Sequence, residues 1–125
     1  VWICNRNAFT SFIGLGLMAD GAIDLLLRKK AGAVITITGA IDIVADGNKA
    51  YIIKNGHPMM SKITGTGCML SAVIGCYIGA NYDDIMDATA AAVCAMGLCG
   101  ELAYKKLCEV DGGTNTYRMF IIDFM

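Results

Sequence analysis

The stretch "KITGTGCMLSAVIGC", residues 62–76, places Gly65 and Gly67 directly before an unbroken apolar run. An apolar run of this length is typical of a buried helix, and we expect Cys68 to open it. A helix N-terminus carries unpaired backbone N–H groups and a partial positive charge. Because glycines there have no Cβ, a ligand can reach these groups directly. The stretch therefore predicts a loop-to-helix junction that can hold an anion.

The candidate anion hole consists of the amides of Gly65, Thr66, Gly67 and Cys68. It is not a Walker A motif, because no Gly-Lys-[Ser/Thr] sequence follows the glycines. A Gly-x-Gly before a helix is equally compatible with a tight turn that binds nothing.

Cys68 would lie at the positive end of this helix, where a thiol ionises more readily than in free solution. Two chemistries follow. The thiol could attack as a nucleophile with His57 as its partner, or it could take a proton from a substrate hydroxyl while the amides hold a phosphoryl group. A buried structural cysteine is the alternative. His57 is the sole histidine, and its Asn-Gly-His-Pro context favours a solvated loop residue.

The elements around the junction indicate an α/β fold. Residues 20–31 have a helical pattern that Gly32 would stop. Residues 33–38, "AVITIT", are apolar on both faces, which predicts a buried parallel strand and half of a βαβ unit. Two short strands should flank the hairpin turn at residues 46–49, "DGNK". A long helical pattern follows over residues 83–108.

The remaining segments have weaker patterns. Residues 1–18 show no clean period, and we expect them to be irregular. Gly97 and Gly100 either let another chain segment approach the long helix closely or mark a break in it. Residues 111–116 resemble a loop, and residues 117–125 are compatible with a short helix or a strand.

Thr38 and Gly39 end the predicted buried strand. Ligands of α/β proteins bind beyond the carboxyl ends of strands, so Thr38 is a candidate contact for a nucleotide or a substrate. Simple termination of the strand is the alternative.

The composition suggests that the chain is part of a larger body. Apolar residues make up 56% of 125 residues, and the share rises further when glycine is counted, well above the roughly 45–50% of typical globular chains. A small self-sufficient domain is mostly surface and needs less. A fragment of a larger domain, which the start at Val1 favours, or a protomer with a broad apolar interface would account for the excess.

Charge and cysteine content restrict the function class. The net charge of −1 argues against nucleic acid as a partner. The apolar stretches at residues 68–82 and 88–100 are shorter than the roughly 18–20 residues that span a bilayer, which argues against a membrane protein. The six cysteines form no C-x-x-C pair, and those from Cys76 onward should be small hydrophobes in helices. We expect a reducing, cytoplasmic location and no zinc site.

The motifs together resemble the hydroxyethylthiazole kinase family, which belongs to the ribokinase-like superfamily. The resemblance runs from about Ala33 to the end and is carried by "VITITGAIDIVADG", "NGHP", "GTGC" and the closing "DGGTNTYRMF". It implies a ribokinase-like α/β fold, with residues 1–125 as one partial domain from the C-terminal portion of a three-layer αβα domain. Residues 1–18 diverge, since Asn5 and Thr10 stand where the family has Arg and Glu.

The resemblance also implies an activity. This is transfer of the ATP γ-phosphoryl group to the hydroxyl of 4-methyl-5-(2-hydroxyethyl)thiazole in thiamine biosynthesis or salvage, with Mg²⁺, in a homotrimer. Thr38 takes the position of an ATP contact, Gly65 that of a substrate contact and Cys68 that of the catalytic base. The alternatives are a ribokinase-like kinase of another small alcohol or sugar, and an inactive remnant that serves as a structural partner.

Overall fold

A tight turn at Asp46 joins two neighbouring strands of the sheet. The computed structural model describes residues 2–5, 8–11 and 33–125. The Asp46 carboxylate accepts hydrogen bonds from the N–H groups of Asn48 (2.7 Å) and Lys49 (2.8 Å), which closes a tight turn. The turn pairs β4 (Asp42–Ala45) with β5 (Ala50–Ile53) as antiparallel strands. The predicted hairpin is confirmed.

β3 (Val34–Ile37) lies at the centre of a five-stranded sheet ordered β2-β1-β3-β4-β5. Its buried residues confirm a strand covered on both faces. The prediction that it is parallel is wrong, because β3 pairs with both β1 and β4 in antiparallel register. The connection from β3 to β4 explains this. It is far shorter than the dozen or more residues that a parallel crossover requires.

The irregular region expected at residues 1–18 contains two strands, so that prediction is wrong for the part that the structure describes. β1 (Trp2–Asn5) and β2 (Ala8–Ser11) form an antiparallel hairpin. Strands of four residues are too short to show a period in the sequence. The helix expected at residues 20–31 lies outside the described residues.

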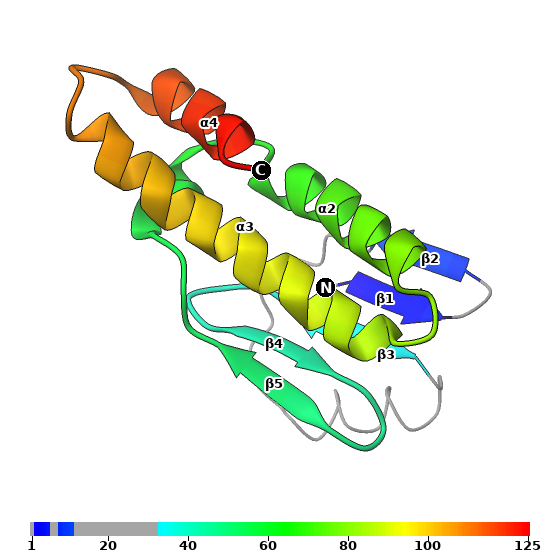
Figure 1. Cartoon of the computed structure of the whole chain (residues 1–125). Helices are drawn as coiled ribbons and strands as arrows, with labels where there is room; N and C mark the ends of the chain where they lie inside the picture. The colour runs from blue at the N-terminus through cyan, green and yellow to red at the C-terminus, as the bar shows by residue number, and fades with distance from the viewer. Residues whose placement is uncertain (1, 6–7, 12–32) are drawn as a thin grey trace.

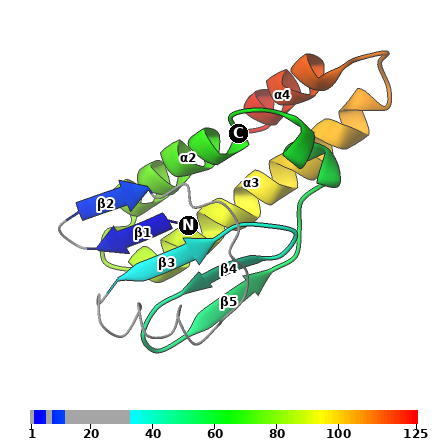
Figure 2. The ribbon, with the colours of Figure 1, turned by 180° about the vertical axis from the view of Figure 1, so that it is seen from behind.

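Two antiparallel helices cover one face of the sheet, as Figures 1 and 2 show from opposite sides. α2 (Thr66–Ala80) begins two residues before Cys68, and α3 (Ile85–Leu107) starts at an Asp84 cap whose carboxylate accepts the Asp87 N–H. Both predicted helices are confirmed. α3 continues through Gly97 and Gly100 without a break.

α4 (Thr114–Asp123) resolves the ambiguous C-terminal segment as a helix that starts inside the predicted loop. It packs on α3 (Figure 1), and its Tyr117 is fully buried with the hydroxyl donating to the Gly100 carbonyl oxygen at 2.9 Å. Burial raises the pKa of Tyr117 to about 12. A short apolar segment of this kind takes its conformation from its packing partner, which the local sequence does not contain.

α3 is long and apolar enough to cross a membrane by length and composition. Its contacts show that these apolar residues pack against the rest of the protein. It packs against β3, β4, β5, α2, α4 and the short helix η1 (Pro58–Lys62), and half of its most apolar window is buried.

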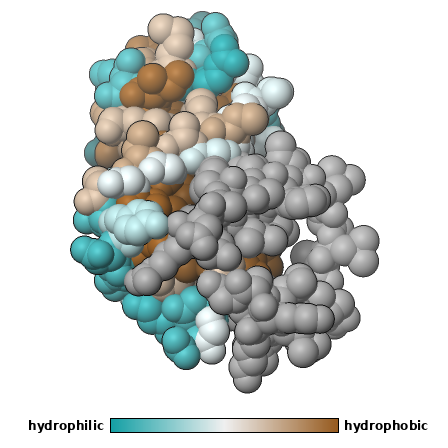
Figure 3. Space-filling view, turned by 90° about the vertical axis from the view of Figure 1, so that its right-hand side faces the viewer, coloured by the Kyte–Doolittle hydropathy of each residue, from teal (hydrophilic) through white to brown (hydrophobic). Residues whose placement is uncertain are grey.

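Many apolar side chains remain on the surface. Figure 3 shows patches of hydrophobic residues between hydrophilic ones on one side of the molecule. Of the later cysteines, Cys76 lies in α2, Cys94 and Cys99 lie in α3, and Cys108 caps the end of α3, as the helical patterns predicted. Only Cys99 among these four is buried. Large exposed apolar residues include Ile41, Ile52, Leu98, Met119, Ile122 and Phe124.

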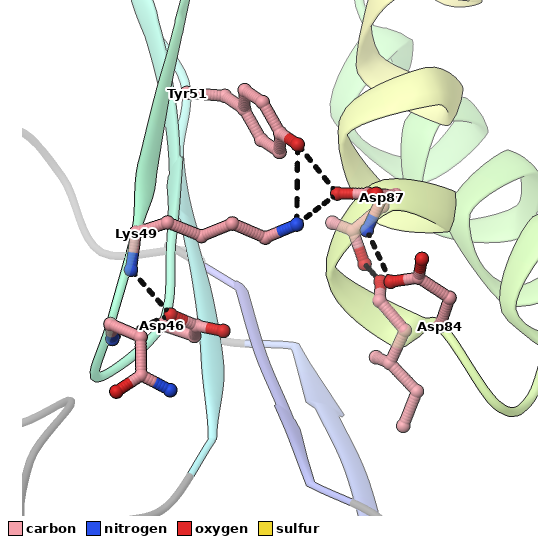
Figure 4. A network of polar contacts seen from close by, with 8 residues as sticks. Asp46, Lys49, Tyr51, Asp84 and Asp87 are labelled. Atoms are coloured by element: carbon pink, nitrogen blue, oxygen red, sulfur yellow. Dashed lines mark hydrogen bonds and ion pairs between the residues drawn. The ribbon is translucent and has the colours of Figure 1, made fainter.

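A charged network joins the hairpin to α3 (Figure 4). The Lys49 ammonium and the Tyr51 hydroxyl both donate to one carboxylate oxygen of Asp87, at 2.5 and 2.6 Å. These bonds, that of Lys49 first, lower the pKa of Asp87. The pKa of Lys49 is raised by its hydrogen bond to Asp87 first, and then by the one that it donates to the Tyr51 hydroxyl at 3.2 Å. The network is exposed, so solvent screens it.

We expect this network to make stability depend on acid pH. The unfolded Asp87 carboxyl has its ordinary pKa of 3.8 and the folded one a lower value. The unfolded chain therefore binds more protons in that window, and the stabilisation present above pH 3.8 is lost as the pH falls further. Urea unfolding midpoints between pH 5 and 2.5 should fall less steeply for Asp87→Asn than for the unchanged chain. Asp83→Asn, at a neighbouring exposed position, is the control, and equal slopes for the two variants would contradict the assignment.

Candidate functional site

A cavity of about 680 Å³ opens beyond the end of β3. Four segments that are distant in the sequence form its walls: the β3–β4 connection, residues 54–61, the first turns of α2, and the middle of α3. Its lining residues are Thr38, Gly39, Ala40, Asp42, Lys54, Asn55, Gly56, His57, Pro58, Met60, Ser61, Thr66, Gly67, Leu70, Val93, Met96 and Gly97.

The N-terminus of α2 meets this cavity without a side-chain cap. Gly65 is the capping residue, its backbone is left-handed with φ 97°, and no side chain caps the helix. The first backbone bond of the helix runs from the Met69 N–H to the Gly65 carbonyl oxygen at 3.0 Å. The amides of residues 66–68 precede that bond, so the helix itself leaves them without acceptors. The first turn has no acidic residue that would compete with an anion.

The structure brings some of the predicted site residues into the cavity wall. Thr38, at the end of β3, lines the same cavity as Thr66 and Gly67 from the start of α2. Gly65 and Cys68 flank these two α2 positions but, among the described residues, they are not part of the lining. The Cys68 side chain is exposed at the helix end.

His57 lines the cavity as a positioned residue and not as a solvated loop side chain. Its ring stacks on Tyr104 of α3, with centroids 3.5 Å apart and planes 18° from parallel. Its Nδ1 accepts the Met59 N–H at 3.1 Å and caps η1. Because Nδ1 is an acceptor here, the neutral ring carries its proton on Nε2.

Asp42 is the acidic residue of the cavity lining. One carboxylate oxygen accepts the Gly39 N–H at 2.9 Å, which holds the turn that follows Thr38. Burial raises the pKa of the Asp42 carboxyl, and the Gly39 hydrogen bond counteracts part of this rise. The carboxylate therefore both shapes the turn and brings negative charge to this end of the cavity.

Sequence reasoning missed several lining residues, among them Asp42, Lys54 and Asn55. The three-residue spacing from Gly39 to Asp42 is a local signal for a side-chain-capped turn and could have been used. Asn55 gave no comparable signal, because its partner is on α3, 39 positions further along the chain.

Comparisons with known proteins identify close relatives. A profile of the hydroxyethylthiazole kinase family matches residues 21–125. A hydroxyethylthiazole kinase of Clostridium acetobutylicum is 63% identical over 95 residues, which are 76% of this chain and 34% of the relative. One from Ruminiclostridium cellulolyticum is 43% identical over 129 residues, covering 98% of this chain and 45% of the relative. The chain thus spans between a third and a half of the length of these relatives.

A solved structure agrees with this. The structure of a hydroxyethylthiazole kinase protein from Pyrococcus horikoshii OT3 superimposes with a TM-score of 0.72 and 26% sequence identity, over 82% of this chain and 38% of that chain. The match confirms the predicted ribokinase-like α/β fold class.

We expect the left-handed Gly65 to be required at the start of α2. Its φ of 97° disfavours any side chain even though an added Cβ would meet no atom within 4 Å. Gly65→Ala should lower the free energy of unfolding by roughly 1–2 kcal/mol. Gly75→Ala, in the middle of the same helix with open space around it, should raise that free energy by roughly 0.5–1 kcal/mol. Chemical denaturation measures both, and equal effects would disprove the role of φ.

Proposed function

The chain belongs to the hydroxyethylthiazole kinase family, and on that premise we propose that it forms part of a kinase active site. The reaction is transfer of the ATP γ-phosphoryl group to the hydroxyl of 4-methyl-5-(2-hydroxyethyl)thiazole, in thiamine biosynthesis or salvage. One observation supports this most directly. The cavity joins Thr38 at the end of β3 to the uncapped, glycine-led start of α2.

The start of α2 supplies the anion hole in this proposal. The amides of residues 65–68 would hold the phosphoryl group as it moves, because their N–H groups and the helix dipole favour added negative charge. Little bond-making is asked of the protein in phosphoryl transfer, so positioning and charge stabilisation account for most of the rate.

The other roles are distributed around that junction. Thr38 would contact ATP from the end of β3, and Gly65 would contact the thiazole substrate from the turn before α2. Cys68 would act as the general base and take the proton of the substrate hydroxyl. Its exposed position at the end of the helix supports access to a substrate that approaches from outside the cavity.

We propose that the metal is Mg²⁺ and that it enters the site bound to ATP. Among the described residues, no group of three His, Cys, Asp or Glu side chains is arranged to hold a metal. Mg²⁺ commonly keeps several waters and binds through substrate phosphates with one or two carboxylates. Asp42, the acidic residue of the lining, is the candidate carboxylate.

We propose a cytoplasmic homotrimer as the assembled form. The exposed apolar side chains, such as Ile52 and Met119, support an assembly that covers them. The free thiols among the described residues suit a reducing compartment.

The proposal predicts phosphorylation of hydroxyethylthiazole by purified protein with ATP. Gly67→Val should reduce the rate by about 100-fold or more, because the added side chain obstructs amides of the anion hole. Gly79→Val makes the same change near the other end of α2, in open space, and should leave the rate nearly unchanged. A coupled assay for ADP release gives both rates.

Two results would contradict this proposal. Faster turnover of a sugar or another alcohol would favour a different kinase. The absence of any heat of binding at millimolar ATP in calorimetry would favour the inactive remnant.

Substitution of Cys68 separates the two possible roles of its thiol. Cys68→Asp should retain activity, because a carboxylate also accepts a proton, whereas Cys68→Ala should lose about 100-fold or more. The turnover number at saturating ATP is the quantity to compare. Complete loss in Cys68→Asp would indicate a covalent role for the thiol instead.

A further inference from the structure

One wall of the cavity is a short segment that rests on a single face of α3. Residues 55–58 and Met60 line the cavity, and each of four successive contacts fastens this segment to α3. These contacts involve positions 94, 97, 100, 101 and 104 of α3. Spacings of three and four residues place them along one side of the helix.

Asn55 makes the first contact. Its Nδ2 donates to the Cys94 carbonyl oxygen at 2.7 Å. The same amide group lies against Gly97 so closely that a Cβ on Gly97 would stand 2.7–2.8 Å from three of its atoms. Asn55 therefore keeps its place only while position 97 is glycine.

Gly56 makes the second contact. Its φ of 115° is left-handed, and its N–H donates to a carboxylate oxygen of Glu101 at 2.8 Å. A hydrogen bond to an ionised acceptor is stronger than a neutral one. Glu101 thus holds the turn in a conformation that the backbone alone would seldom adopt.

The remaining two contacts use ring and thioether surfaces. The His57 ring stacks on Tyr104, which in turn meets the Tyr117 ring edge-on at 6.4 Å. Met60 lies over Gly100, where an added Cβ would stand 2.3 Å from its sulfur. The wall is in this way built into the junction of α3 with α4.

We propose that Gly97, Glu101 and Tyr104 are positioning residues of the nucleotide site. They hold the Asn55–Met60 wall in its binding conformation before ATP arrives, although none of the three needs to contact ATP. When a loop is ordered before the ligand binds, the binding free energy does not include the entropic cost of ordering it. This inference rests on the proposed function, because it takes ATP as the ligand of the cavity.

Matched pairs of variants test the proposal by calorimetry with ATP, using the full chain. Glu101→Ala removes the acceptor for the Gly56 N–H and should weaken ATP binding by about tenfold, as expected for one charged hydrogen bond. Glu101→Gln keeps an acceptor oxygen and should restore most of the affinity. Likewise Tyr104→Leu should weaken binding, while Tyr104→Phe keeps the stacked ring. Glu109→Ala, whose carboxylate pairs with Lys106 on the surface, is the control.

The outcomes distinguish failure of the positioning role from failure of the proposed kinase function. Unchanged protein that binds no ATP would overturn the proposed function. Unchanged protein that binds ATP, with Glu101→Ala and Tyr104→Leu binding equally well, would overturn the positioning role alone. A merely structural role would lower the melting temperatures of Glu101→Ala and Tyr104→Leu and leave their affinity for ATP unchanged. Should Glu101→Ala fail to fold, Gly97→Ala, which displaces Asn55, carries the same prediction and the same contrary result.

Discussion

The small-residue surface of α3 is the constraint on which the other elements depend. Ala92, Gly97, Gly100 and Ala103 are all buried and carry little or no side chain. Other elements can therefore come close to the helix axis, and α3 contacts the sheet, α2, α4 and η1 along its length. Close packing yields dispersion and hydrophobic energy only where surfaces meet without gaps. A larger side chain at Gly97 or Gly100 would collide with Asn55 or Met60.

The candidate site follows from the same packing. α2 lies antiparallel beside α3 (Figure 1), which carries the glycine-led end of α2 to the region beyond β3. The segment from Asn55 to Met60 closes the third side because α3 offers it a carbonyl, a carboxylate and a ring. The anion-binding amides, the end of β3 and this wall come from three separate stretches of the chain. Only their shared contact with one helix assembles them into one cavity.

Local patterns predicted the elements well and their relations less well. The hairpin at Asp46 and the two long helices follow from turn chemistry and periodicity, which operate over a few residues. The predicted parallel orientation of β3 was wrong. A strand that is buried on both faces is apolar whether its neighbours run parallel or antiparallel to it, so its sequence does not reveal the orientation. At the site, the helix end at Gly65 was predictable, whereas the hydrogen bond of Asn55 to α3 was not. That bond joins positions 39 residues apart.

The sequence by itself determined the glycine-led helix start, the strand that precedes Thr38 and the family to which the motifs belong. Those features are local, because capping, turn formation and side-chain periodicity depend on neighbouring residues. The tertiary structure alone decided that Thr38 and Gly67 line one cavity, that His57 stacks on Tyr104, and that α4 is a helix. These depend on contacts between segments distant in sequence, whose energies arise only when the chain has closed on itself.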